Sequence, residues 1–209
     1  MVITYDGIQA VKITQGDITI AFNPPSKDSK VKGSTFGADI ALITSNHPDF
    51  NGSESTSRGD KESFAITGPG EYEVKDFFIR GFASKSAYDG KERINTIYSL
   101  GIDGINIAFL GALSETELSP ETKEDLGEAD ILFVPIGGDG VLNASEAYKL
   151  AVKREPKIII PIHYGEVGEK DALTKFLKEG GQEKSKALDK LTVKKKDLEG
   201  KIGEIVVLK

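Results

Sequence analysis

The sequence has no cysteine, and it has only two histidines, His47 and His163. Without cysteine there is no disulfide, no thiolate metal ligand and no cysteine nucleophile. A catalytic zinc site usually takes three protein ligands, most of them histidine. Any zinc site in this chain therefore needs carboxylates beside its two histidines, which limits the metal chemistry more than any other feature of the composition.

Long apolar runs and an excess of positive charge are also missing. No stretch approaches about 18 apolar residues, so we expect no membrane span. The N-terminal residues alternate like a strand and do not form a signal peptide, which makes the cytoplasm the expected compartment. The formal net charge is −6, whereas nucleic-acid binders usually carry a basic patch. We therefore expect neither nucleic acid nor membrane as a partner, but an unknown small molecule or protein, with a homo-oligomer as a further option.

The composition is that of a folded protein. The 209 residues are 38% hydrophobic and 29% charged, which is typical of globular chains and long enough for a well-buried core. We expect one domain over residues 1–209.

Buried strands followed by polar loops recur along the chain. Apolar runs at 38–43, 130–135 and 157–162 predict strands that are covered on both faces. Two of them, ADIALIT and ADILFVP, resemble each other and suggest two halves of similar plan. The segment NTIYSLGIDGINIAFLG predicts a hairpin that turns at Asp103 and Gly104, and Asn143 is the expected cap of an amphipathic helix. These patterns predict a sandwich of two sheets with helices outside.

Both histidines follow buried strands, where α/β proteins usually place their sites. In ITSNHPDFNG, His47 and Asp49 are two residues apart, so an extended segment, stiffened by Pro48, would point them to the same side. His163 follows the run IIIPI. Two histidines and one carboxylate can form a facial triad on a divalent metal. The alternative is that each histidine only bonds to nearby backbone, because a lone histidine is weak evidence of a site.

Taken in order, these blocks resemble the metallo-β-lactamase superfamily. ITSNHPDFNG is similar to its first metal motif, His-x-His-x-Asp-His after an apolar strand. TGPGEYEV, NTIYSLGIDGINIAFLG, ADILFVPIGG and PKIIIPIHYG resemble later blocks of the Zn-dependent hydrolase branch that includes the L-ascorbate-6-phosphate lactonases. The resemblance implies a four-layer αββα sandwich, in which helices flank two mixed β-sheets, and a two-metal hydrolytic site.

The resemblance also implies ligands that this sequence lacks. The first and last histidines of the motif fall on Ser45 and Phe50, and the bridging aspartate falls on Ala112. A further histidine, expected near Tyr88, is absent. The ligand positions that remain are His47, Asp49 and His163.

These losses argue against a two-metal centre. Two cations about 3.5–4 Å apart need an anionic bridge, which alanine cannot supply. We therefore expect no resident cofactor and a degenerate member of the family that keeps the fold for binding or assembly. The alternative is a mononuclear hydrolase of a small ester, lactone or phosphorylated compound, with one zinc or other divalent ion on His47, Asp49 and His163. A nucleic-acid-processing role, known in other branches of this fold, is disfavoured by the acidic charge.

Overall fold

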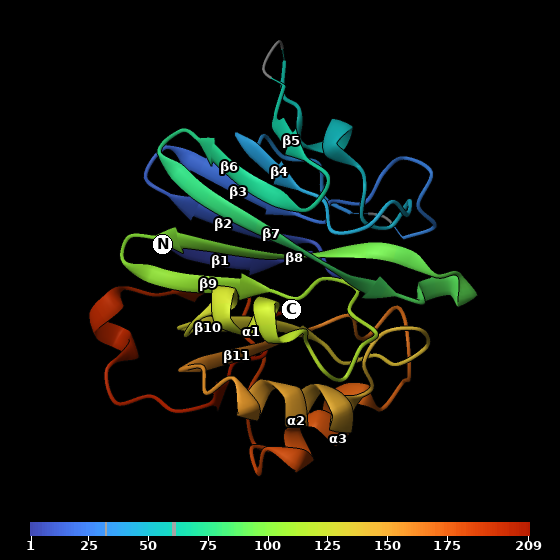
Figure 1. The fold of residues 1–209 in the computed structure, drawn as a ribbon, viewed down its shortest axis with the longest axis vertical. Coiled ribbons are helices and arrows are strands. Elements are labelled where there is room, and N and C mark those ends of the chain that lie inside the picture. The colour runs from blue at the N-terminus through green and yellow to red at the C-terminus, as the bar shows by residue number, and fades with distance from the viewer. Residues whose placement is uncertain (32, 60–61) are drawn as a thin grey trace.

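Two mixed β-sheets face each other across an apolar core (Figure 1). The computed structural model describes residues 1–31, 33–59 and 62–209. Within these ranges the first sheet has six strands and the second has seven. Across the same ranges, no helix has both the length and the apolar character that a membrane span requires. The predicted two-sheet sandwich is confirmed.

The first sheet has the order β12-β1-β2-β3-β4-β5, antiparallel from β12 to β3 and parallel from β3 to β5. Its strands are β1 (Val2–Tyr5), β2 (Val11–Gln15), β3 (Ile18–Phe22), β4 (Ile40–Leu42), β5 (Phe64–Ile66) and β12 (Leu191–Thr192).

The second sheet has the order β13-β11-β10-β9-β8-β7-β6, parallel from β13 to β9 and antiparallel from β9 to β6. Its strands are β6 (Gly70–Val74), β7 (Phe77–Ser86), β8 (Arg93–Ile102), β9 (Ile105–Phe109), β10 (Ile131–Pro135), β11 (Ile158–Ile162) and β13 (Glu204–Ile205). The three predicted buried strands are present as β4, β10 and β11, all of whose residues are buried.

The helices are distributed less evenly than a four-layer plan implies. Buried residues of α1 (Pro120–Leu126), α2 (Ala144–Lys153) and α3 (Ala172–Glu179) share one apolar cluster with the second sheet. On the first sheet, the described part of the chain has only loops and the 3-10 turn η1 (Ser53–Thr56), and Phe36 lies against the Lys12 ammonium of β2. The segment that enters this loop begins Asn-Pro-Pro, and the two prolines lack the backbone N–H groups that a strand or a helix interior needs. The remaining 3-10 turns are η2 (Tyr88–Gly90) and η3 (Lys195–Leu198).

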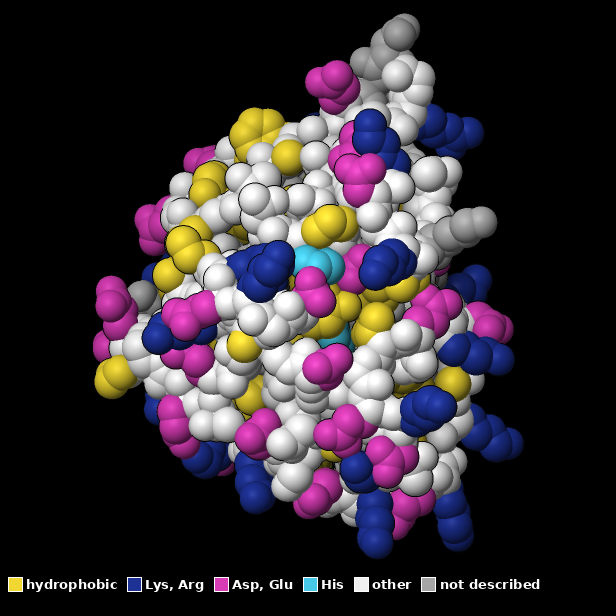
Figure 2. Space-filling view, turned by 90° about the vertical axis from the view of Figure 1, so that its right-hand side faces the viewer, with side chains coloured by type: hydrophobic (Ala, Val, Ile, Leu, Met, Phe, Trp, Pro, Cys, Tyr) yellow, Lys and Arg dark blue, Asp and Glu magenta, His cyan; other side chains and the backbone are white. Residues whose placement is uncertain are grey.

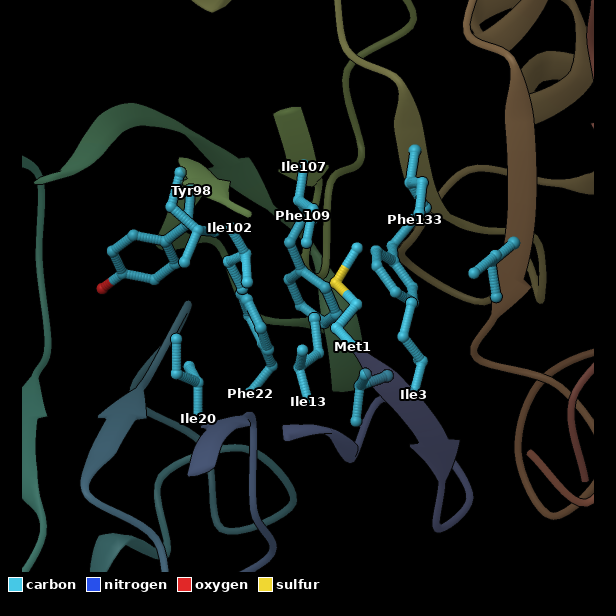
Figure 3. Close-up of a cluster of buried hydrophobic side chains, with 14 of the residues drawn as sticks. Met1, Ile3, Ile13, Ile20, Phe22, Tyr98, Ile102, Ile107, Phe109 and Phe133 are labelled. Atoms are coloured by element: carbon cyan, nitrogen blue, oxygen red, sulfur yellow. The ribbon is translucent and has the colours of Figure 1, made fainter. Parts of the chain in front are cut away.

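The core between the sheets is aromatic and aliphatic. Phe22 at the end of β3 stacks on Phe109 at the end of β9, with ring centroids 4.6 Å apart, and Phe109 contacts Phe133 at 5.5 Å. Figure 3 shows such side chains from both sheets pointing toward one another. The hydroxyl of Tyr98 on β8 also donates a hydrogen bond to the carbonyl of Ile43, directly after β4 of the first sheet, at 2.8 Å. Each fully buried large side chain contributes roughly 1.5–3 kcal/mol to this packing.

The two similar halves suggested by the sequence are visible in the hydrogen bonding. Asp39 and Asp130 precede β4 and β10, and both are buried. Asp39 accepts a hydrogen bond from Thr19 N at 2.9 Å, and Asp130 accepts one from Asn106 N at 2.8 Å. Thr19 and Asn106 occupy the same position in β3 and β9. Each carboxylate therefore fixes one parallel strand pair, and with it the loop that leaves the pair at its carboxyl end.

Candidate functional site

Loops that leave four different strands meet at one edge of the sandwich. A small apolar cluster there contains Phe50 after β4, Tyr88 after β7, Ala112 after β9 and Val141 after β10, together with Ile8 from the loop between β1 and β2. All five side chains are buried. Figure 2 looks onto this edge, where histidine lies in a hollow with Lys or Arg on both sides and Asp or Glu around it.

The structure brings both histidines to this cluster. His163, directly after β11, is fully buried and has a left-handed backbone with a φ of 61°. Its ring lies edge-on to Tyr88, with centroids 4.9 Å apart, and the His47 ring lies 4.9 Å from the same tyrosine. Phe50 contacts both imidazoles, at 5.5 and 6.2 Å. The two histidines therefore surround a common pair of aromatic rings.

The carboxylate of Asp49 joins the same group through hydroxyl hydrogen bonds. Oδ1 accepts from Ser29 Oγ at 2.6 Å, and Oδ2 accepts from the Tyr88 hydroxyl at 2.9 Å. The nearest imidazole nitrogen, His47 Nδ1, lies 3.6 Å from Oδ2. Tyr88 thus has its hydroxyl on Asp49 and its ring against both histidines.

The local backbone around His47 differs from the extended segment expected from the sequence. Phe50 N and Asn51 N donate to the carbonyl of His47, at 2.8 and 3.0 Å, which closes a turn. Pro48 occupies the second position of this turn, which its fixed φ favours. The expectation of an extended segment was therefore wrong. His47 and Asp49 are neighbours because the Asp49 N–H donates to His47 Nδ1 at 3.2 Å.

The positions where the family resemblance implies ligands are occupied by non-ligands. Phe50 and Ala112 are fully buried in the apolar cluster. The hydroxyl of Ser45 is buried and has no hydrogen-bond partner among the described residues. In the same residues, no three or more His, Cys, Asp or Glu side chains are arranged to hold a metal ion. This donor set does not fit a two-metal centre, because the aromatic rings fill the space between the remaining candidates.

The surroundings keep these groups in their neutral forms. Complete burial lowers the pKa of His163 to about 3. Burial also lowers the pKa of His47, although Asp49 acts in the opposite direction. For Tyr88, burial and then the hydrogen bond to Asp49 raise the pKa of the phenol well above its usual value. Tyr88 therefore acts as a hydrogen-bond donor and not as a phenolate ligand at neutral pH.

A cleft of about 440 Å³ lies over this group. His47, Asp49 and Tyr88 form part of its lining. The rest of the lining is Asp28, Lys30, Pro48, Asp89, Lys91, Arg93 and Asp139. The cleft is polar and carries both signs of charge, so it is suited to bind a polar ligand at a surface whose buried floor is aromatic.

The sequence did not reveal the part that Tyr88 and Ser29 play. Tyr88 was identified only as a place where a histidine was missing, and Ser29 was not identified at all. Their common partner, Asp49, is 39 residues from Tyr88 and 20 from Ser29. The one signal in the sequence was Tyr88 itself. It places an aromatic ring with a hydroxyl close to the position where the family resemblance implies a histidine ligand.

Comparisons with known proteins agree with this architecture. The family model of the β-lactamase superfamily domain matches residues 2–163. A UPF0173 metal-dependent hydrolase of Natranaerobius thermophilus is 28% identical in an alignment of 185 positions, which covers 78% of this chain and 83% of the relative. A UPF0173 protein of Pyrococcus furiosus is 35% identical over 104 residues, 48% of this chain and 45% of that protein.

The solved structures include a proposed Zn-dependent hydrolase of the metallo-β-lactamase superfamily from Thermotoga maritima. It superimposes with a TM-score of 0.75 at 25% identity, over 99% of this chain and 97% of that one. The order of strands, the meeting of loops at one edge and these matches lead to one conclusion. The chain belongs to the metallo-β-lactamase superfamily.

Proposed function

We propose that this chain is a non-hydrolytic member of the superfamily, in which a packed aromatic and polar group replaces the metal centre and the cleft above it binds a small molecule or a protein. The observation that carries the proposal is the position of Tyr88. Its hydroxyl is bonded to Asp49, and its ring lies against His47 and His163. Some relatives that share the fold are named metal-dependent hydrolases. Those names describe the relatives and do not assign the same activity to this chain.

Energetics support the exclusion of a metal. A cation between the three candidate ligands would have to break the Tyr88 hydrogen bond to a carboxylate, which contributes about 1.5–3 kcal/mol. It would also have to displace a largely buried ring, at about 2 kcal/mol. Together these terms come to about 4 kcal/mol, which weakens binding about a thousandfold. With only three protein ligands available, that penalty favours the packed tyrosine.

Strained backbone conformations around the cleft support a binding role for it. Ile8, Asp89 and His163 have φ values of 44°, 58° and 61°, a region that costs non-glycine residues about 1–3 kcal/mol each. Ile8 is β-branched, for which this conformation is especially unfavourable. Such strain gathers at functional sites. Its presence under an accessible cleft supports the inference that the cleft still binds something.

The second candidate function is a mononuclear hydrolase of a small ester, lactone or phosphorylated compound. It is favoured by the closeness of His47, Asp49 and His163, whose imidazoles are both neutral. It requires Tyr88 to leave the group and a single divalent ion to take its place.

Metal content separates the two proposals. Protein purified from zinc-containing medium and dialysed is expected to carry well under one equivalent of zinc. Added zinc is expected to leave the melting temperature unchanged, because only an ion that binds the native state raises stability. At a zinc concentration 100 times the Kd, a real site would add about 2.7 kcal/mol. One equivalent that survives dialysis, or a rise in Tm at micromolar zinc, would favour the mononuclear enzyme.

A further inference from the structure

A buried line of hydrogen bonds runs from the backbone of Thr44, just after β4, to His163. Thr44 N donates to Asn23 Oδ1 at 2.8 Å, and Asn23 Nδ2 lies 2.7 Å from Gln9 Oε1. Gln9 Nε2 then lies 2.9 Å from Nδ1 of His163. All four residues are at most 1% exposed. They come from four separate loops, so the line is a built feature of the fold.

The direction of every hydrogen bond in this line follows from its first member. A backbone N–H can only donate, so the oxygen of the Asn23 amide must face Thr44. The amide nitrogen of Asn23 then donates to Gln9 Oε1, and its second hydrogen reaches Thr44 Oγ1 at 2.8 Å. With its oxygen used in this way, Gln9 presents its NH₂ group to His163. Nδ1 of His163 therefore accepts a hydrogen bond.

We infer that Gln9 is a positioning residue that fixes the tautomer of His163 with the proton on Nε2. A neutral imidazole has one protonated and one unprotonated nitrogen. Gln9 donates to Nδ1, so Nδ1 is the unprotonated nitrogen and Nε2 carries the proton. Nε2 is buried and has no hydrogen-bond partner among the described residues. This inference deepens the proposed non-hydrolytic function, because it makes the only fully buried histidine of the site a donor toward its interior.

The consequence for metal binding is direct. A histidine ligand needs a bare nitrogen toward the metal, and it usually donates its other N–H to a carboxylate, carbonyl or water. Gln9 reverses that arrangement, since it donates where an acceptor is needed. Turning both amides around would point Asn23 Nδ2 at the Thr44 N–H. The Thr44 N–H and an Asn23 N–H would then face each other, and both would lack an acceptor, whereas in the assigned arrangement only the Nε2–H of His163 lacks one. Because each buried donor without an acceptor costs about 1–3 kcal/mol, the opposite tautomer is a minor state.

The tautomer can be measured directly by ¹H–¹⁵N correlation of ¹⁵N-histidine-labelled protein. The chain has two histidines and thus four ring nitrogens, and a His47→Gln variant assigns them. In the parent, His163 is expected to show a bare Nδ1 and a protonated Nε2. In Gln9→Glu, the carboxylate can only accept, so the proton is expected to move to Nδ1. His47 serves as the internal reference, because Gln9 bonds only to Asn23 and His163 in the described structure.

A second measurement connects the tautomer to metal binding. Zinc affinity is compared by calorimetry between Tyr88→Ala and the double variant Gln9→Glu/Tyr88→Ala, so that the ring is removed in both. The double variant is expected to bind zinc at least tenfold more tightly, within the 10–100-fold range that such supporting partners contribute. Should Gln9→Glu fail to fold, Gln9→Met, which has no N–H to donate, is expected to give a mixture of tautomers.

The outcomes separate this inference from the proposed function. A parent spectrum with the proton on Nδ1 overturns the role of Gln9 and leaves the non-hydrolytic proposal standing. A switched tautomer with equal zinc affinity in the two Tyr88→Ala proteins overturns the link to metal binding. Stoichiometric zinc in a parent whose His163 keeps its proton on Nε2 overturns the proposed function and leaves the tautomer assignment intact.

Discussion

The hydroxyl of Tyr88 donates a 2.9 Å hydrogen bond to the carboxylate of Asp49. This contact links the loop after β4 to the turn η2 and gives the Asp49 carboxylate a hydrogen-bond donor. The buried carboxylate needs partners, since an unpaired charge away from water is costly. Tyr88 and Ser29 supply hydroxyls to its two oxygens. The ring that carries the first hydroxyl also separates the two histidines.

Removal of that hydroxyl tests its contribution. Tyr88→Phe keeps the ring and deletes the hydrogen bond, so we expect the free energy of unfolding to fall by about 1.5–3 kcal/mol, the usual range for a hydrogen bond to a charged group. Denaturant unfolding measures the change. Tyr148→Phe is the control, because Tyr148 makes no hydrogen bond through its hydroxyl in the described residues, and it should stay within about 0.5 kcal/mol of the parent. Equal effects in both variants would contradict this role of Tyr88.

The low pKa of His163 makes stability depend on pH. The folded state holds this imidazole neutral down to about pH 3, whereas the unfolded chain protonates it near pH 6.5. The unfolded state therefore binds more protons below pH 6.5, and the contribution is full above that value and lost as pH falls toward 3. Between pH 8 and pH 5 we expect a loss of about 2 kcal/mol from this residue.

The control for this pH dependence is His163→Gln, whose side chain does not titrate. Its unfolding free energy, followed from pH 8 to pH 5 in the same denaturant series, is expected to fall about 2 kcal/mol less than that of the parent. Parallel curves for the two proteins would mean that His163 is not buried in its neutral form.

Two glycines with positive φ offer a matched pair for the crowding around the site. A Cβ on Gly111 would lie 2.6 Å from Asn95 Oδ1 and 2.7 Å from the Thr44 side chain, while a Cβ on Gly104 meets nothing within 4 Å. Both replacements by alanine pay about 1–2 kcal/mol for the left-handed backbone. Gly111→Ala is expected to lose about 1–3 kcal/mol more, because the packed neighbours must move. Equal losses would show that the loop after β9 is looser than the contacts indicate.

The sequence predicted local structure well because local signals determine it. The apolar runs became β4, β10 and β11, and Asn143 does cap α2, with Glu146 completing the capping box. The hairpin turn at Asp103 and Gly104 has the positive φ values, 52° and 72°, that its residues allow. Each of these features depends on residues close in the chain.

The parts that could not be predicted depend on distant residues. Gln9 and His163 are 154 positions apart, and no pattern in either neighbourhood indicates their contact. The sequence does not distinguish a turn at His47 from an extended segment, because Pro48 fits both an extended segment and the second position of a turn. The three α-helices of the described residues pack on the second sheet, and the sequence could not indicate this, because no local rule fixes which sheet a helix will cover.

If the metal ligands of the family have been replaced in this chain, substitutions that restore them should restore zinc binding. Ser45→His, Phe50→His and Ala112→Asp restore the ligands implied by the family resemblance. In the structure, however, the Tyr88 side chain would still occupy the space beside His47, Asp49 and His163. We therefore expect that Tyr88→His must be added before zinc binds strongly. Without metal the rebuilt protein should be less stable than the parent, since the new carboxylate is buried without a partner, and thermal unfolding with and without zinc measures this.

Zinc calorimetry on the parent and on this fourfold variant, side by side, tests the central claim most directly. The parent is expected to release no heat of binding up to 100 μM zinc, while the fourfold variant binds at least one equivalent and gains Tm by the linkage between binding and folding. A parent that binds one equivalent of zinc at micromolar concentration, with Tyr88 in place, would contradict the account.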